Sequence, residues 1–202
     1  MAGSVAEYGG DLEAVTVAPD GRSLSVVFRA PPEHLAPLAR VEVIAHDDCV
    51  QVDPILTYVE GSHAAAKVRR TATVTLGEPL LGRPVFGGRQ QLVRPQPGLF
   101  NVEPDSWEHA VVTPDDRHVA IYFVSGPPPL HELDHVDVRY EPGRIVFTVY
   151  VGTTEDVDSW KLPAISRVVL CELDEPVAGR RLVDGSPPPR GARDPLESPD
   201  SG

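Results

Sequence analysis

Three residues in the second half of the chain, His131, Glu132 and His135, follow the H-E-x-x-H spacing found in zinc peptidases. On a helix, two histidines four residues apart share one face and can bind zinc, while the glutamate activates a metal-bound water. Glu155 lies twenty residues beyond His135 and could supply a third ligand. The pattern predicts, as one alternative, a zinc-dependent hydrolase. Its ligands would be His131, His135 and Glu155, with Glu132 as the general base.

The residues on either side of this segment argue against a helix. Pro127-Pro128-Pro129 comes before it, and proline removes the amide donors that a helix needs. Residues 136–140 follow with the period-two alternation of a strand. The context therefore favours a loop that leads into a strand, with no catalytic residue, metal ligand or cofactor. A loop site for a divalent metal, formed by His131, Asp134 and His135, is a further alternative that needs no helix.

Other catalytic signatures are missing from the sequence. There is no G-x-S-x-G elbow, no phosphate-binding loop and no dinucleotide-binding fingerprint. Serine, histidine and aspartate are present, but they occur in no order that identifies a catalytic triad. The sequence therefore gives no support for nucleophilic catalysis.

A repeat organises the chain that carries these residues. Segments of the first half recur in the second at an offset of 95 residues, which becomes 97 further along each copy. The matched segments are Pro19–Arg22 with Pro114–Arg117, Val26–Phe28 with Ile121–Phe123, Leu38–Val43 with Leu133–Val138, and Leu76–Pro79 with Leu173–Pro176. The repeat predicts two tandem copies of one module, at residues 1–87 and 109–185, joined by a linker at 88–108.

Composition and periodicity predict strands in both copies. Twenty-two prolines and seventeen glycines interrupt the chain too often for long helices. The expected strands are Leu12–Ala18, Ser23–Arg29, Arg40–Ala45, Cys49–Tyr58 and Val68–Leu76 in copy one, and Ala110–Thr113, His118–Val124, His135–Tyr140, Arg144–Val151 and Arg167–Leu173 in copy two. Pro54, inside one of these strands, predicts a bulge or an edge position.

This pattern predicts an all-β fold of two tandem antiparallel β-sandwich modules. Five or six short strands per copy, separated by frequent turns, are typical of an Ig-like sandwich. The chain lacks the cysteine and tryptophan spacing of true immunoglobulin domains. Residues 186–202 contain almost no apolar side chains, and we expect them to form a disordered tail.

Four segments of copy two carry a family resemblance. They are Leu133–Val138, Thr148–Thr153, Leu173–Arg180 and Leu182–Gly185. These segments resemble β-rich duplicated-domain proteins of actinobacteria, and the similarity covers copy two well and copy one loosely. Those proteins are functionally uncharacterised, so the resemblance implies a β-rich fold and assigns no catalytic or binding residue.

Charge, hydropathy and cysteine content bear on the partners of the protein, its location in the cell and its disulfide state. The net charge of -12 repels phosphate backbones, so we expect no nucleic-acid partner. The chain has no basic leader followed by an apolar run, and no stretch of roughly 18 apolar residues, so we expect a cytoplasmic protein that does not enter membranes. Cys49 and Cys171 lie at non-equivalent positions of the two copies, and the sequence leaves open whether they form a disulfide.

These observations favour a non-enzymatic binding or scaffolding protein that acts through contacts with an unknown protein partner. The hypothesis rests on the duplication, since β-sandwiches often serve as recognition modules, and on the absence of a convincing catalytic constellation. Besides the zinc-dependent hydrolase, a small-molecule carrier is an alternative. It would have an apolar cavity near Phe100, Trp107 and Trp160.

Overall fold

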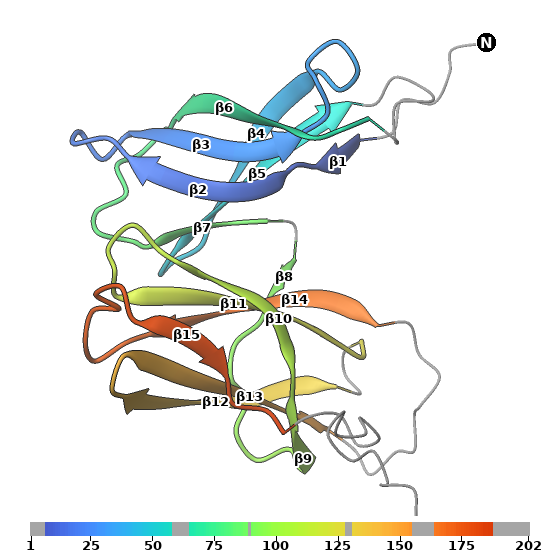
Figure 1. The fold of residues 1–202 in the computed structure, drawn as a ribbon, viewed down its shortest axis with the longest axis vertical. Coiled ribbons are helices and arrows are strands. Elements are labelled where there is room, and N and C mark those ends of the chain that lie inside the picture. Colours follow the sequence, from blue (N-terminus) through green and yellow to red (C-terminus); the bar gives the residue numbers. More distant parts are fainter. Residues whose placement is uncertain (1–6, 58–64, 89, 128–130, 155–163, 188–202) are drawn as a thin grey trace, which may run out of the picture. The chain divides into compact units, whose positions relative to one another are not determined.

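The computed structural model of the chain describes residues 7–57, 65–88, 90–127, 131–154 and 164–187 (Figure 1). These ranges contain fifteen β-strands and no helix, so the prediction of an all-β fold is confirmed. Glu155, Trp160 and residues 188–202 lie outside the described residues, and only Ser186 and Pro187 of the predicted tail lie within them.

The strands form four sheets. The strands are β1 (Glu7–Gly9), β2 (Asp11–Val17), β3 (Ser23–Ala30), β4 (Leu38–Ala45), β5 (Val50–Thr57), β6 (Val68–Thr75), β7 (Val85–Gly87), β8 (Gln91–Leu92), β9 (Phe100–Asp105), β10 (Trp107–Val112), β11 (His118–Ser125), β12 (Glu132–Glu141), β13 (Arg144–Thr153), β14 (Ile165–Glu172) and β15 (Arg181–Asp184). The sheet orders are β1-β5-β4, β2-β3-β6, β10-β11-β14-β8 and β12-β13-β15, with β7 added to β5 and β9 added to β13. The pairs β5–β7 and β13–β15 are parallel, which differs from the fully antiparallel sheets that we predicted.

The chain divides into two compact units, each of which takes segments from both sequence copies. Unit 1 comprises Met1–Leu92, Ala110–Tyr122 and Val168–Ala178, and unit 2 comprises Val93–His109, Phe123–Arg167 and Gly179–Gly202. The predicted linker, residues 88–108, contains β8, β9 and the start of β10. The boundaries expected at residues 87, 108 and 185 stay predictions.

Unit 1 is sandwich-like, because the sheets β2-β3-β6 and β1-β5-β4 bury one face each in a common core. The cluster contains Leu24, Val26 and Phe28 from β3 and Val50, Val52 and Leu56 from β5, with partly buried Val41 and Val43 of β4 packed against it. The buried cluster residues of β3 lie two apart, as expected when one face of a strand is covered, whereas β5 is buried from Val50 to Leu56 on both faces.

Pro54 lies inside β5, between β4 and β1, so the predicted edge or bulge position is wrong. On the side of β5 away from β4, β7 pairs with Val50–Val52 and β1 pairs with Ile55–Thr57. The Pro54 carbonyl faces this side, where it accepts a 2.8 Å hydrogen bond from the Gly10 amide. The missing N–H of Pro54 faces the same side and falls between the two pairings, where it removes no ladder hydrogen bond.

A second buried cluster in unit 1 joins segments that are far apart in the sequence. It contains Cys49, Phe86, Ala120, Tyr122 and Val168. The Tyr122 hydroxyl donates a hydrogen bond to the Gly87 carbonyl, which satisfies the one polar group of this side chain. Burial raises the pKa of Tyr122, so the hydroxyl keeps its proton and remains a donor at neutral pH.

Neither cysteine forms a disulfide, and both are buried in unit 1. The structure therefore contains no disulfide between Cys49 and Cys171, a point that the sequence left open. Burial raises the pKa of the Cys171 thiol to about 12. Because the thiolate is the reactive form, Cys171 is inert at neutral pH.

Unit 2 is built around the hairpin of β12 and β13. Ile145, Phe147 and Val149 of β13 are fully buried, as is Leu133 of β12. Trp107 is partly buried, and its indole Nε1 donates a 3.2 Å hydrogen bond to the Phe147 carbonyl. Val146 and Thr148, on the other face of β13, are buried as well, so β13 forms the centre of the packing in unit 2.

Strand registers in the first half of the chain recur in the second half at the offsets seen in the sequence. Corresponding pairs are Val41–Pro54 and Val136–Val149 in the hairpins, Tyr8–Leu56 and Glu103–Val151 at the next strand, and Val50–Val85 and Ile145–Leu182 in the parallel pairs. Both hairpins have a bulge at the equivalent position, where the extra residue is Ala39 in β4 and Asp134 in β12.

The turns recur as well. Asp20 Oδ1 accepts hydrogen bonds from the amides two and three residues ahead, at 2.8 and 3.0 Å, and Asp115 Oδ1 makes the same bonds at 2.9 and 3.1 Å. Leu81 and Ala178, which lie 97 residues apart, both adopt a positive φ, of 53° and 50°. The two halves of the chain therefore share a backbone plan down to individual turns.

Candidate functional site

The structure places the H-E-x-x-H segment at the start of a strand. His131 lies just before β12, and Glu132 is the first residue of that strand. Successive side chains of a strand project to opposite faces, and there is no helical turn to bring residues i and i+4 together. The two histidines therefore lack the helix that the zinc-peptidase pattern requires.

The two histidine rings lie in separate environments. His131 packs against Gly126, where an added Cβ would come within 2.4 Å of the ring. His135 stacks on Tyr150 with ring centroids 4.4 Å apart and the planes inclined by 10°. Among the described residues, no group of three or more His, Cys, Asp or Glu side chains is placed to hold a metal ion. Glu155, the predicted third ligand, lies outside them.

Glu132, the predicted general base, faces a buried cation. Its Oε2 lies 3.5 Å from Nη1 of Arg167 in β14. Arg167 is 0% exposed, and its Nε and Nη2 have no hydrogen-bond partner within the described ranges. Burial lowers the pKa of the Arg167 guanidinium, and the negative charge of Glu132 acts in the opposite direction. This geometry gives Glu132 a structural partner.

Asp134, the extra residue of the β12 bulge, holds the segment that precedes β9. Its Oδ1 accepts hydrogen bonds from the amides of Gly98 and Leu99, at 3.0 and 3.1 Å, and its Oδ2 lies 2.6 Å from His135 Nδ1. These contacts lower the pKa of the Asp134 carboxyl, and the hydrogen bond with His135 has the largest effect. Sequence analysis had named Asp134 only as a metal ligand in a loop.

The aromatic residues predicted to line a carrier cavity lie in different surroundings. Phe100 is 59% exposed on β9. Trp107 hydrogen bonds through both its side chain and its backbone amide, the latter to Asp184 Oδ2 at 3.2 Å. Trp160 lies outside the described residues. Neither of the two crevices described next is lined by Phe100 or Trp107.

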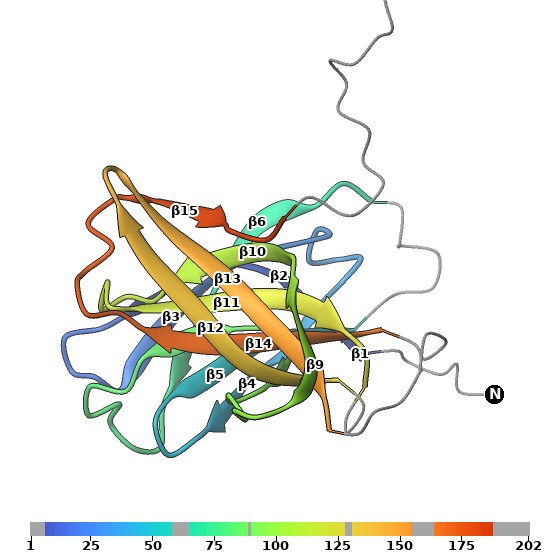
Figure 2. The same cartoon turned by 90° about the horizontal axis from the view of Figure 1, so that it is seen from below.

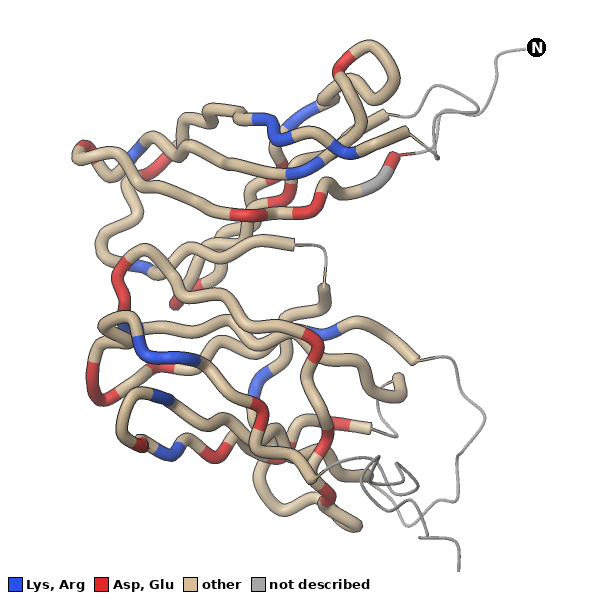
Figure 3. The backbone as a smooth tube through the Cα atoms, in the orientation of Figure 1, with Lys and Arg blue, Asp and Glu red and all other residues tan. Residues whose placement is uncertain are grey.

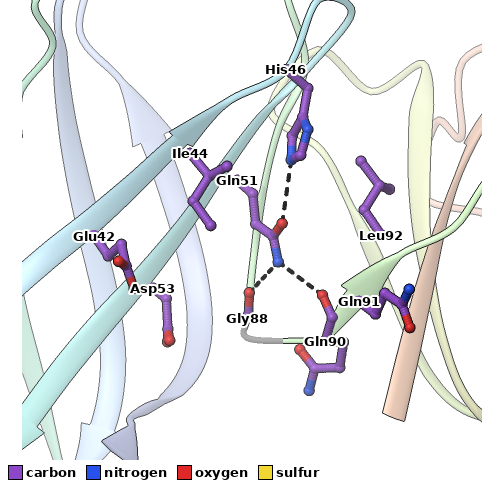
Figure 4. Close-up of a pocket in the computed structure, with 9 residues that line it drawn as sticks. All are labelled: Glu42, Ile44, His46, Gln51, Asp53, Gly88, Gln90, Gln91 and Leu92. Atoms are coloured by element: carbon purple, nitrogen blue, oxygen red, sulfur yellow. Dashed lines mark hydrogen bonds between the residues drawn. The ribbon is translucent and has the colours of Figure 1, made fainter. Parts of the chain in front are cut away.

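Unit 1 contains a crevice of about 450 Å³, shown in Figure 4. We call it the acidic crevice. Its lining consists of Glu42, Ile44 and His46 from β4 and the following turn, Gln51 and Asp53 from β5, and Gly88, Gln90, Gln91 and Leu92 from the segment that leads into β8. A second crevice, of about 300 Å³, lies over the opposite, apolar side of β4 and includes Val43, Val50 and Leu76.

An amide network fixes one wall of the acidic crevice. Gln51 is 4% exposed, and its Nε2 donates to the carbonyl oxygens of Gly88 and Gln90, the second at 3.1 Å. Its Oε1 lies 3.5 Å from His46 Nε2 (Figure 4). Because both donors of the amide are used, Gln51 ties the segment before β8 to β5 and acts as a rigid wall.

Two carboxylates form the other wall of the acidic crevice. Glu42 of β4 and Asp53 of β5 are direct cross-strand neighbours, and Asp53 is 3% exposed. The pKa of the nearby Arg40 is raised, chiefly by its 2.8 Å hydrogen bond to Glu7 and further by the charges of Glu42 and Asp53. The crevice therefore carries a negative field that already acts on one cation.

Sequence analysis missed this crevice, although a signal for it existed. Glu42 and Asp53 lie equally far from the turn between β4 and β5, as do Ile44 and Gln51, and residues placed in this way meet across a hairpin. The segment before β8 had no comparable signal, because it comes from the predicted linker and meets β5 only in the folded chain.

Comparison of the chain with protein-family models, curated protein sequences and solved structures found no match. The resemblance to actinobacterial proteins therefore stays a prediction. Within the described ranges, no helix has the length and apolar character needed to cross a membrane. The function has to be argued from the geometry of the chain itself.

Proposed function

We propose that the chain is a non-enzymatic binding or scaffolding protein that acts through protein–protein contacts. The observation that carries the proposal is the acidic crevice, which lies on one face of the edge strand β4. Among the described strands, β4 pairs only with β5, so an extended segment of a partner can add to its second edge. Such a segment would place alternate side chains on the face that carries Glu42 and Ile44.

The chemistry of the crevice favours a basic side chain of the partner. Like charges directly opposite each other across two strands are destabilising, and Glu42 and Asp53 hold such positions. A lysine or arginine beside Glu42 reduces this repulsion and gains complementary charge. Ile44 is 43% exposed and offers apolar surface next to it. The partner class is therefore an extended segment in which basic and apolar residues alternate.

We further propose that the chain consists of two Ig-like β-sandwich modules that arose by internal duplication. The recurrence of strand registers, bulges and turn hydrogen bonds at offsets of 95 and 97 residues supports this origin. The proposed setting is the cytoplasm, without nucleic acid or membrane as a partner. Neither the zinc-dependent hydrolase nor the small-molecule carrier has a comparable supporting geometry among the described residues.

Two labelled peptides test the proposal. The basic probe is a fluorescein-labelled, acetylated Val-Arg-Val-Arg-Val amide, and its acidic twin has glutamate at both arginine positions. We expect fluorescence anisotropy to show binding of the basic probe at least about tenfold tighter than binding of the acidic one. Glu42→Gln should weaken the basic probe about fivefold, because it removes one charge at the contact.

Glu108→Gln is the matched control, because it removes the same charge from an exposed position on β10, outside the crevice. It should leave the affinity for the basic probe unchanged. Equal affinities for the two probes, or equal losses in the two variants, would contradict the proposed contact site. Substrate turnover by the purified chain would contradict the non-enzymatic function.

A further inference from the structure

Among the described residues, the strand β12 has an open edge at Val136 and Val138. It is the outermost strand of its sheet and pairs only with β13 among the described strands (Figure 2). Its first residues are covered, because the Gln96 amide donates to the Leu133 carbonyl at 2.8 Å and Asp134 holds the following segment. At Val136 and Val138, the described residues make no backbone hydrogen bond to the outer edge.

The two-residue turn of the hairpin shows which backbone groups face this edge. Glu141 and Arg144 flank the turn and lie opposite each other. In two-residue hairpins the flanking residues exchange hydrogen bonds, so alternate residues turn their backbone groups outward. These residues are Val136, Val138 and Tyr140. The outward carbonyl of Leu133 fits the same alternation, because the bulge adds one residue between it and Val136.

Acidic and basic residues alternate along the open part of β12, as the coloured backbone of Figure 3 shows. Asp137 and Arg139 are about half exposed and lie 3.7 Å apart. If two β12 strands run antiparallel with Val138 on the two-fold axis, Asp137 of each copy lies opposite Arg139 of the other. His135 then lies opposite Glu141, and Val136 opposite Tyr140. Opposite charges and pairs of aromatic with β-branched residues are the favourable cross-strand combinations.

We propose that β12 pairs antiparallel with β12 of a second copy of this chain, about a two-fold axis at Val138. The resulting dimer joins two hairpins into one sheet of order β13-β12-β12-β13. Such a contact is isologous, so each favourable pair occurs twice. It also covers an edge strand that would otherwise present unpaired backbone groups. The inference goes beyond the proposed function, because it concerns a different strand and a different partner.

In the equivalent register, the corresponding strand of the first half does not have this pattern. Self-pairing of β4 about Val43, which is the counterpart of Val138, would set Glu42 opposite Ile44 and Arg40 opposite His46. No opposite charges meet in that arrangement. In this equivalent register the two hairpins share their backbone, so the difference between β4 and β12 lies in the side chains alone.

Sedimentation equilibrium on the full chain tests the proposal, over about 1 to 300 μM protein. We expect a monomer–dimer equilibrium for the parent chain. Asp137→Arg and Arg139→Asp should each raise the dissociation constant of the dimer at least about tenfold, because each substitution places like charges opposite each other twice in the dimer. An equimolar mixture of the two variants should recover the dimer, as should the chain that carries both substitutions.

Recovery in the mixture shows that both variants fold, because a misfolded chain has no edge to pair. Glu108→Arg, which makes the same change of charge on β10, is the control and should dimerise like the parent chain. A parent chain that is monomeric at all concentrations would overturn the proposal. So would a dimer that persists in both single variants, or single variants whose mixture stays monomeric.

Discussion

The hairpins β4–β5 and β12–β13 have the same backbone and different surface chemistry. They share the register, the bulge and the parallel strand added to the second strand. On one face of each hairpin, however, Glu42 and the buried Asp53 of the first hairpin correspond to Asp137 and the buried Thr148 of the second. On the other face, buried residues such as Val52 and its counterpart Phe147 are apolar in both hairpins. The comparison teaches that apolar packing on one face fixes the frame of each hairpin, while the opposite face is free to acquire separate binding properties.

A second comparison concerns two arginines 97 residues apart, Arg70 in β6 and Arg167 in β14. Arg70 donates to the carbonyls of Pro31 and Ala36, at 3.3 and 2.6 Å, and also to the Glu33 carboxylate. Its guanidinium lies 5.3 Å from the centre of the Phe28 ring. Arg167 is more deeply buried and has only the 3.5 Å contact with a carboxylate described above. Equivalent positions thus hold one satisfied and one poorly satisfied cation.

Replacing each of these arginines by methionine should give the largest difference in the free energy of unfolding between equivalent positions of the two halves. Arg70→Met leaves the buried Ala36 carbonyl without its donor and removes the contact with Phe28, so it should lower the free energy of unfolding by about 2–3 kcal/mol. Arg167→Met removes a buried charge with unpartnered donors and should change that free energy by less than about 1 kcal/mol. Urea denaturation measures both values.

Glu132→Gln in the Arg167→Met background is the control for the carboxylate that this substitution leaves without its cation. It should have no destabilising effect there. Equal losses of stability at the two arginine positions would show that Arg167 has contacts as strong as those of Arg70, and the comparison would fail.

The next largest effect is expected at the bulge residues. Asp134 holds the segment before β9 through its carboxylate, whereas its counterpart Ala39 has no polar side chain. Asp134→Ala should speed hydrogen exchange of the Gly98 and Leu99 amides about tenfold, since both lose their acceptor. Exchange measured by NMR checks this, with Glu108→Ala as the control. Unchanged protection of these amides would mean that the segment is held by other contacts.

The same carboxylate predicts a pH dependence. The pKa of Asp134 is lowered from its usual value of 3.8, so its charged form stabilises the folded chain. This stabilisation is fully present above pH 3.8 and is lost as the pH falls through the lowered pKa. The Tm difference between the parent chain and Asp134→Ala should therefore be constant near neutral pH and shrink in acid. A Tm difference that grows in acid would show that the charged form of Asp134 does not stabilise the folded chain.

The turn aspartates give the smallest expected difference. Asp115 accepts a 2.6 Å hydrogen bond from Thr113 Oγ1 and lies 2.7 Å from His118 Nδ1, whereas Asp20 gains only a 3.3 Å bond from Ser23 Oγ beyond the shared amide bonds. Asp115→Ala should cost about 1 kcal/mol in the free energy of unfolding, and Asp20→Ala should cost less. Urea denaturation that ranks them in the opposite order would contradict this interpretation.

The strands that the sequence predicted well are those with one apolar face. The expected strand Ser23–Arg29 differs from β3 by one residue, and Val68–Leu76 differs from β6 by one residue. Their apolar side chains alternate because one face of each strand is buried. This pattern can be seen in the local sequence, without knowing which strands pair with them. The change of offset from 95 to 97 in the sequence also appears in the structure. In the parallel pairs, Val50 of β5 corresponds to Ile145 at an offset of 95, whereas its partner Val85 of β7 corresponds to Leu182 at an offset of 97.

The strands that the sequence missed are short or depend on distant partners. β1, β7 and β8 have two or three residues each, which is too few to show a period. β9 contains Pro104 and lies in a segment whose composition suggested a linker. Parallel pairs such as β5–β7 join residues far apart in the chain, so no turn between them marks their register. The acidic crevice was missed for the same reason, because one of its walls comes from such a segment.

The discontinuous make-up of unit 1 affects how the chain folds during synthesis. Its first segment ends at Leu92, but its last segment, Val168–Ala178, leaves the ribosome 86 residues later. At about 5–20 residues per second this interval lasts roughly 4–17 s. During that time apolar side chains such as Phe86, which packs against Val168 in the finished unit, lack their final cover. The nascent chain therefore has a period of exposure to chaperones that a contiguous module would not have.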